Sequence, residues 1–191
     1  MASTYETSDF RKGLKIFWDD VPWVVVDFQH VKPGKGNAFT RTRLRNLLTG
    51  SQQEVTFKSG ERVGDPEIED RQMQFLYNEG DVYHFMDQKN YEQVELQKES
   101  LGDSAQFLLP EMQAAVMFFR GRAINVDIPQ HVVLKITYCE PGVRGDTATN
   151  VTKPATLETG AIIAVPLFIN EGDKVKVDTR SGEYLERTSI G

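Results

Sequence analysis

Apolar and polar positions alternate along most of the chain, in short runs separated by turns. In residues 1–64 these runs are LKIFW, WVVVDFQHV, AFTRTRLRNLL and EVTFK, and residues typical of turns, such as Asp and Gly, lie between them. Short runs rich in β-branched and aromatic residues, with such breaks, are typical of β-strands. The first part of the chain is therefore predicted to be a small barrel of short strands.

The middle of the chain shows the same pattern with one interruption. The runs RQMQFLY and VYHFM flank NEGD, and AVMFF and AINVDIP flank RGR, which predicts two hairpins. Between them, Asp103 is placed to cap the N-terminus of a short helix that Pro110 limits. Strands with one helical insert are the pattern of a five-stranded barrel of the oligonucleotide-binding (OB) kind.

The last third starts another set of strands after Pro129. Its runs are VVLKITYCE, AIIAVPLFI, KVKVDT and RSGEYLER, and the long polar loop PGVRGDTATNVTKPA follows the first of them. The turn NEGD occurs at residues 78–81 and again at 170–173, which is consistent with two similar barrels. We therefore predict an all-β chain of three domains, residues 1–64, 65–128 and 129–191. Units of roughly 60 residues are close to the lower limit of independent stability, so they are expected to pack on one another.

Charge is divided unevenly among these domains, although the whole chain of 191 residues has a net charge of −6. Residues 1–64 contain ten Lys and Arg against seven Asp and Glu, whereas residues 65–128 contain five against thirteen. The change falls in the polar stretch SGERVGDPEIED, where we place the first boundary. Within residues 31–58, six basic residues stand against one acidic residue, so this segment is predicted to attract a polyanion in spite of the net charge.

Nothing in the composition points to export or to a membrane. The first residues, MASTYETSDFRKG, contain no apolar run of the kind found in signal peptides, and no segment approaches the roughly 18 to 20 apolar residues of a membrane span. The single cysteine, Cys139, lies at strand spacing and is expected to be a packed residue rather than a nucleophile. We expect a cytoplasmic protein with no internal disulfide.

Three arginines beside the first long turn are predicted to form a basic stripe. Arg41, Arg43 and Arg45 alternate with smaller or apolar residues, so a strand places the three guanidinium groups on one face. A solvated outer face of the barrel is one interpretation, and a contact with phosphates is the other. The position of the stripe next to a lysine-bearing turn favours the second.

The turn KPGKGNA carries Lys35 between two glycines. It does not match a nucleotide-binding P-loop, because Lys35 is followed by Gly36 and Asn37 and then by a strand pattern. In a hairpin turn, Pro33 fixes the approach, and Gly34 and Gly36 permit positive φ on both sides of the lysine. The ammonium is then presented bare, on strands long enough to carry it clear of the core. A flexible turn with a solubilising lysine is the alternative.

No constellation of side chains indicates an enzyme. The histidines His30, His84 and His131 lie far apart in the sequence, so we expect no metal site. The sequence holds no nucleophile elbow, and the acidic residues of the middle third are expected to form a solvated face. We therefore predict no catalytic residue, no bound cofactor and no enzymatic activity.

Three stretches carry a resemblance to a known family. They are SDFRKGLKI near the start, VKPGKGNAF at the turn and GDTATNVTKPATLETGAIIAVPLFINEGDKVKVDTRSGEYLER near the end. Through them the chain resembles bacterial elongation factor P over essentially its whole length. The last stretch keeps the spacing of the family signature at Lys153, Ala155, Gly160, Ile163, Val165, Pro166, Ile169 and Gly172.

The resemblance implies an architecture and a role. The architecture is three β-barrels in an L-shaped, tRNA-like arrangement, with a KOW or SH3-like barrel followed by two OB-fold barrels. The role is to bind, as a monomer, between the peptidyl-tRNA and exit sites of a 70S ribosome stalled on consecutive prolines. There the factor would position the CCA end of the peptidyl-tRNA (tRNA-Pro) and stimulate peptide bond formation, while the ribosome performs the chemistry.

The resemblance also assigns a covalent modification. Lys35 occupies the position that the family modifies, commonly with a β-lysyl group, and an enzyme resembling lysyl-tRNA synthetase would attach it. A lysine at this position excludes the branch of the family that glycosylates an arginine. The acidic middle domain is expected to face solvent or a basic ribosomal protein of the stalk on the exit side.

The remaining assignments concern RNA contacts. The residues expected to contact tRNA are Lys32, Pro33, Gly34, Lys35, Gly36, Arg41, Arg43 and Arg45. The residues expected to face the small subunit and the mRNA are Gly145, Asp146, Thr147, Arg180 and Tyr184. For Tyr184 a purely structural role is an equal alternative.

Two other classes of protein remain open. Biotinyl and lipoyl swinging-arm carriers also modify a lysine at a hairpin tip, although in MKM or DKA contexts rather than in GKG beside arginines. A general RNA-binding protein with an unmodified lysine would use the same basic surface.

Overall fold

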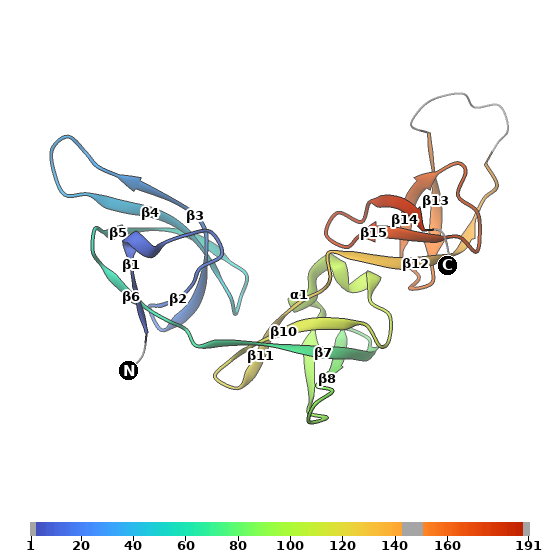
Figure 1. Cartoon of the computed structure of the whole chain (residues 1–191), viewed down its shortest axis with the longest axis horizontal. Coiled ribbons are helices and arrows are strands. Elements are labelled where there is room, and N and C mark those ends of the chain that lie inside the picture. Colours follow the sequence, from blue (N-terminus) through green and yellow to red (C-terminus); the bar gives the residue numbers. More distant parts are fainter. Residues whose placement is uncertain (1–2, 143–150, 189–191) are drawn as a thin grey trace. The chain divides into compact units, whose positions relative to one another are not determined.

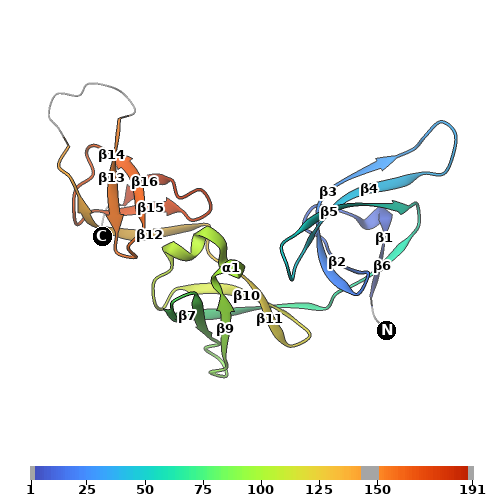
Figure 2. The same cartoon turned by 180° about the vertical axis from the view of Figure 1, so that it is seen from behind.

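The computed structural model describes residues 3–142 and 151–188 of the chain (Figure 1, Figure 2). Strands account for nearly all of its regular structure, and they form three sheets, which confirms the predicted all-β class. One short α-helix and two 3-10 helices interrupt the strands in the described residues. No helix in this part of the chain is long and apolar enough to cross a membrane.

The first sheet has the strand order β1-β6-β2-β3-β4-β5. Its inward-facing side chains, such as Ile16, Leu44 and Phe57, are almost fully buried in one core. The tight turn between β2 and β3 holds Asp19 and Asp20 at positive φ, a conformation that aspartate tolerates in two-residue hairpins. The elements are β1 (Thr4–Glu6), η1 (Thr7–Asp9), β2 (Lys15–Trp18), β3 (Val21–Val31), β4 (Phe39–Asn46), β5 (Gln52–Lys58) and β6 (Arg62–Gly64).

The second sheet has the order β11-β10-β7-β8-β9. Both hairpins predicted from the sequence are present, since β7 and β8 flank the NEGD turn and β10 and β11 flank the RGR turn. The elements are β7 (Ile68–Glu79), β8 (Val82–Met86), β9 (Gln93–Gln97), α1 (Lys98–Leu101), η2 (Gly102–Phe107), β10 (Gln113–Phe119) and β11 (Arg122–Asp127).

The predicted helix lies here, but the prediction that Asp103 caps it is wrong. α1 begins at Lys98, directly after β9, and Gly102 ends it at a positive φ of 65°. Asp103 lies inside the first turn of η2, which ends at Phe107 before Pro110. The helix therefore starts where strand pairing stops, and no side chain caps its N-terminus.

The third sheet has the order β14-β13-β12-β15-β16. Alternate residues such as Leu134, Ile136 and Val175 are fully buried in its core. Cys139 is buried too, with Sγ 3.6 Å from the carbonyl oxygen of Ile169, so the prediction of a packed thiol is confirmed. The strands are β12 (His131–Cys139), β13 (Thr152–Leu157), β14 (Ile162–Pro166), β15 (Lys174–Asp178) and β16 (Tyr184–Thr188).

The chain forms two compact units. The first contains the residues up to Asp70 together with Met117–Asn125, and the second contains Arg71–Val116 and the residues from Val126 onward. In the second unit, Phe107 of η2 is 1% exposed and lies in the same core cluster as the buried side chains of the third sheet. A residue from the segment between β9 and β10 thus completes the core of the third sheet.

Candidate functional site

The candidate site lies on the hairpin of β3 and β4, at the end where the two strands join. The strands pair antiparallel up to His30 with Thr40 and Val31 with Phe39, and residues 32–38 make the turn between them. In Figure 1 this turn projects beyond the rest of the first sheet. The long hairpin predicted from the sequence is present.

The conformation of the turn differs in part from the prediction. Gly36 takes a positive φ of 109°, where an L-residue would be strained, but Gly34 does not lie in that region. A Cβ added at Gly34 would meet no atom within 4 Å. The prediction of positive φ on both sides of Lys35 is therefore wrong for Gly34, because one left-handed residue suffices to close this turn. The free space at Gly34 leaves room for another molecule to approach the turn.

The cations of the turn are exposed. Lys32 through Asn37 are all exposed, and within residues 3–142 and 151–188 the ammonium of Lys35 has no hydrogen-bond or ion-pair partner. An unpaired primary amine at the end of a projecting hairpin is accessible to a modifying enzyme and to a polyanion. The structure thus presents Lys35 in the way that the sequence predicted.

The base of the turn is held in place by polar contacts. Nδ1 of His30 lies 2.8 Å from Oγ1 of Thr40, which is 2% exposed, and the backbone N–H of Ser59 donates to the carbonyl oxygen of Ala38 at 3.0 Å. A surface pocket of about 390 Å³ lies beside these residues and includes Lys32. The sequence analysis did not assign His30 or Thr40 to the site. Their positions on either side of the predicted turn did indicate that both lie at the ends of strands.

The three arginines of β4 follow the predicted alternation. Arg41, Arg43 and Arg45 are exposed, while Thr42 and Leu44 between them are fully buried. A period of two therefore places all three guanidinium groups on the outer face of the sheet, beside the turn. This confirms the predicted stripe as a geometric feature.

The stripe is partly neutralised by carboxylates on both neighbouring strands. Nε of Arg41 lies 3.4 Å from Oε1 of Glu54, and Arg43 pairs in register with Asp27 on β3 and Glu54 on β5. Lys12 lies 3.1 Å from Asp27. The Lys12 ammonium, with a smaller contribution from Arg43, holds the pKa of Asp27 below its usual value. On this outer face of the first sheet, basic and acidic side chains alternate between neighbouring strands, and the basic side chains are in excess.

Two cations of this face were missed in the sequence analysis. Lys15 on β2 lies in one cross-strand row with Val24 on β3 and Arg45 on β4, and its ammonium is 3.0 Å from a carboxylate oxygen of Asp70. Lys12 precedes β2 and lies against β3 through Asp27. Both come from the segment FRKGLK, whose charge is visible in the sequence but whose proximity to β4 depends on strand pairing.

Of the residues predicted to face the small subunit, the structure describes Arg180 and Tyr184, and both belong to the part of the chain that forms the third sheet. Gly145, Asp146 and Thr147 lie outside the described residues. The guanidinium of Arg180 is exposed and lies 4.0 Å from a carboxylate oxygen of Asp127. Tyr184 is partly buried and packs against the core of the third sheet, which favours the structural alternative for this residue.

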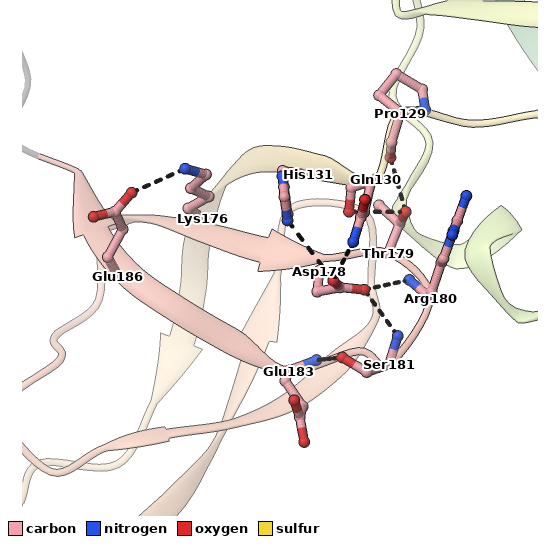
Figure 3. Close-up of polar contacts among 10 residues, drawn as sticks. All are labelled: Pro129, Gln130, His131, Lys176, Asp178, Thr179, Arg180, Ser181, Glu183 and Glu186. Carbon is pink, nitrogen blue, oxygen red and sulfur yellow. Dashed lines mark hydrogen bonds and ion pairs between the residues drawn. The ribbon is translucent and has the colours of Figure 1, made fainter.

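The turn that carries Arg180 is organised by Asp178 (Figure 3). The carboxylate of Asp178 accepts hydrogen bonds from the backbone N–H groups of Arg180 at 2.8 Å and Ser181 at 3.0 Å, and from the side chain of Gln130 at 3.3 Å. The two backbone donors, with Ser181 contributing most, hold the pKa of Asp178 below its ordinary value. The Oγ1 hydroxyl of Thr179 is 2.8 Å from the carbonyl oxygen of Pro129, and it therefore ties the turn to the segment that precedes β12.

The part of the chain that the structure describes offers no metal site. Within the described residues, no three His, Cys, Asp or Glu side chains are placed to hold one metal ion. The chemistry that the described site offers is cationic contact and an exposed primary amine at Lys35.

Comparison with known proteins finds relatives along the whole chain. Three family models match it, described as "Elongation factor P (EF-P) KOW-like domain" at residues 6–63, "Elongation factor P (EF-P) OB domain" at 68–126 and "Elongation factor P, C-terminal" at 132–187. The expected succession of a KOW-like fold and OB folds is thereby confirmed.

Individual relatives agree with the family models. Proteins named "Elongation factor P" are 51% identical over 185 residues in Bdellovibrio bacteriovorus and 53% identical over 179 residues in Clostridioides difficile. These alignments cover 97% and 94% of this chain, and 98% and 97% of the relatives. A solved structure titled "Eukaryotic translation initiation factor 5A from Methanococcus jannaschii" is 25% identical, with a TM-score of 0.55 over 65% of this chain and 94% of that one.

Proposed function

The chain belongs to the elongation factor P family of translation factors, and on that premise we propose that it relieves ribosomes stalled on consecutive prolines. The family acts with the ribosome and tRNA and is not a family of enzymes. In the proposed role, the protein binds in the cytoplasm between the peptidyl-tRNA and exit sites of the 70S ribosome. The Lys35 side chain, extended by a covalent group, then steadies the CCA end of the peptidyl-tRNA.

One observation carries this proposal: the ammonium of Lys35 is exposed and has no partner in the described part of the chain, at the end of a projecting hairpin. A lysine that only kept the protein soluble would need no such projection. A lysine that must reach another molecule's reacting terminus needs both a bare amine and a stiff carrier. The pairing of β3 with β4 up to the turn supplies the carrier.

The proposed gain is positional. Proline is a constrained partner in peptide bond formation, so its reaction depends more than others on the alignment of the reacting ends. Ordering reactants lowers a barrier by up to about 7 to 11 kcal/mol in model reactions, which sets the upper limit of what the factor could contribute. The protein supplies orientation and the ribosome supplies the reaction centre.

The surrounding residues support this role in two ways. Lys32 and the stripe of Arg41, Arg43 and Arg45 would neutralise tRNA phosphates, and their partial pairing with carboxylates would keep the surface from binding RNA indiscriminately. Gly34 has open space around its Cα, so a tRNA backbone would approach closely there.

The proposal extends to partners and to the modification. The group on Lys35 is proposed to be of the β-lysyl type, attached by an enzyme resembling lysyl-tRNA synthetase. The acidic second sheet is proposed to meet a basic ribosomal stalk protein. Gly145, Asp146 and Thr147 are proposed to face the small subunit, and the exposed side chain of Arg180 is proposed as a further RNA contact.

The test begins with the intact mass and fragmentation of the protein purified from its native host. An added β-lysyl mass on the peptide that contains Lys35 is the expected result. Biotin or lipoate on that peptide would instead identify a swinging-arm carrier, and an unmodified lysine under all growth conditions would identify a plain RNA-binding protein.

The second part of the test measures synthesis of a polyproline peptide in a reconstituted translation system. Lys35→Ala and Lys35→Arg are both expected to abolish rescue while leaving the fold intact, since arginine keeps the charge but has no primary amine. Lys174→Ala removes an exposed lysine that lies outside the basic segment and the Lys35 turn, and it serves as the matched control. Full rescue by Lys35→Ala would refute the role assigned to this side chain.

A further inference from the structure

The turn between β10 and β11 has an unusual residue at its strained position. Arg120 and Gly121 form this turn with φ values of 51° and 77°. Two-residue turns with two positive φ values favour Asn, Asp or Gly at the first position, because longer side chains are disfavoured in the left-handed region. An arginine there raises the question of what its side chain contacts.

The guanidinium of Arg120 lies over two aromatic rings. Its Cζ is 5.2 Å from the ring centroid of Phe17 on β2 and 5.0 Å from that of Phe119, its neighbour on β10. The two rings lie 6.1 Å apart at an interplanar angle of 35°. Both distances are within the range of cation–π attraction. One arginine therefore connects the tip of the β10–β11 hairpin to a strand of the first sheet.

Phe17 is held in place by its own neighbours in the first sheet. Phe17 pairs with Gly64 on β6, and a Cβ added at Gly64 would lie 3.4 Å from Cβ of Phe17 and 3.5 Å from its carbonyl oxygen. These are ordinary van der Waals distances, so the backbone of β6 at Gly64 packs closely against Phe17. Met117–Asn125 also fall in the same compact unit as the residues up to Asp70, which is the unit that carries the Lys35 turn.

We propose that Arg120 is a positioning residue: it clamps β2 to the tip of the β10–β11 hairpin and thereby gives the Lys35 turn a stiff mount. This proposal rests on the proposed function. If the Lys35 turn acts by orienting another molecule, its effect depends on how firmly the sheet that carries the turn is held in position. Loss of the clamp would broaden the range of positions of Lys35 without removing any group that contacts the ribosome.

The variants that test this proposal are chosen from the conformation of the β10–β11 turn. Arg120→Asn keeps a residue that suits the left-handed position and removes the guanidinium. Arg122→Asn is the matched control, because Arg122 is an exposed arginine of the same hairpin and the change in charge is the same. Phe17→Leu attacks the same contact from the other side, so its effect and that of Arg120→Asn should be less than additive in the double variant.

The first measurement does not depend on the ribosome. Spin labels on Gln53→Cys in β5 and Ala123→Cys in β11, both in the first compact unit, report the distance distribution between the first sheet and the β10–β11 hairpin in the full-length chain with Cys139→Ser. Arg120→Asn should at least double the width of this distribution, and Arg122→Asn should leave it unchanged. An unchanged width in Arg120→Asn overturns the clamp.

The second measurement is polyproline synthesis as a function of factor concentration. Arg120→Asn should lower the saturating rate three- to tenfold while the half-saturating concentration changes less than twofold, whereas loss of folded protein would leave the rate at saturation intact. A broadened distribution with an unchanged rate, in an assay where Lys35→Ala is inactive, overturns the positioning role alone. Full activity of Lys35→Ala would refute the proposed function, and the spin-label result would still decide whether the clamp exists.

Discussion

Phe107 offers the sharpest test of how the second compact unit is built. It ends η2, between strands of the second sheet, yet its side chain lies in the core cluster of the third sheet and is 1% exposed. Gly182, in the turn before β16, stands directly over it, since a Cβ added there would lie 3.5 Å from Cζ of Phe107. The change Phe107→Ala should therefore affect both sheets of this unit.

The magnitude follows from the burial. Removing a fully buried phenylalanine side chain costs about 3 to 5 kcal/mol, because transfer energy is lost and a cavity remains. Total stabilities of domains are about 5 to 15 kcal/mol, so this change removes a large fraction. At roughly 4 °C per kcal/mol for a unit of about 110 residues, the melting temperature of the unit should fall by roughly 12 to 20 °C.

The assay is chemical unfolding combined with native-state hydrogen exchange. Phe107→Ala should raise the exchange of amides in β12 and β15, because the side chain lies in the core of the third sheet. The exchange of amides in β8 should rise by the same free energy, because Phe107 also ends the segment that connects strands of the second sheet. Tyr91→Ala is the control: this aromatic side chain of the same unit is 72% exposed, so its removal should change stability by less than about 0.5 kcal/mol. Faster exchange in only one of the two sheets would refute this joint effect of Phe107.

Three further predictions concern the turn, the stripe and the third sheet. Gly36→Ala should distort the Lys35 turn, because its φ of 109° is strained for alanine, whereas Gly34→Ala should leave the turn unchanged, and NMR chemical shifts of the turn would show both results. Arg43→Ala should weaken ribosome binding and reduce the slope of the logarithm of the binding constant against the logarithm of the salt concentration by about 1. Arg41→Ala should reduce this slope less, because the guanidinium of Arg41 already lies 3.4 Å from a carboxylate. Equal slopes in the wild type and Arg43→Ala would argue against a phosphate contact. Because the pKa of Asp178 is lowered in the folded state, its contribution to stability is complete above the ordinary value of 3.8 and is lost as the pH falls through the lowered value. Urea unfolding should therefore show Asp178→Asn less stable than the wild type at neutral pH, with the difference shrinking in acid; a constant difference would contradict this origin.

The local pattern of the sequence was sufficient for most of the strands and for the direction of their side chains, but not for β13, which begins at Thr152 inside the stretch predicted to be a polar loop. The alternation in β4 predicted that Arg41, Arg43 and Arg45 would point outward, and they do. The KPGKGNA turn predicted an exposed lysine between two long strands, which the structure also shows. These features follow from the period of two of a strand and from the backbone preferences of Gly and Pro, which act over a few residues.

Prediction from the sequence failed where the conformation of a residue depended on the path of the backbone on either side of it. Asp103 has the chemistry of a helix cap, but the chain enters α1 directly from β9, so that the helix begins five residues earlier, at Lys98. Gly34 and Gly36 look equivalent in the sequence, and only Gly36 needs a positive φ because closing the turn requires one such residue.

The sequence by itself thus determined most of the strands, the projecting lysine and the family of this protein. Only the tertiary structure decided which distant groups meet: Asp27 with Lys12, Phe107 with the core of the third sheet, and Arg120 with Phe17. The physical reason is that side-chain alternation is set by each strand alone. Contacts between residues far apart in the sequence depend on how strands pair and how cores close, which no local pattern records.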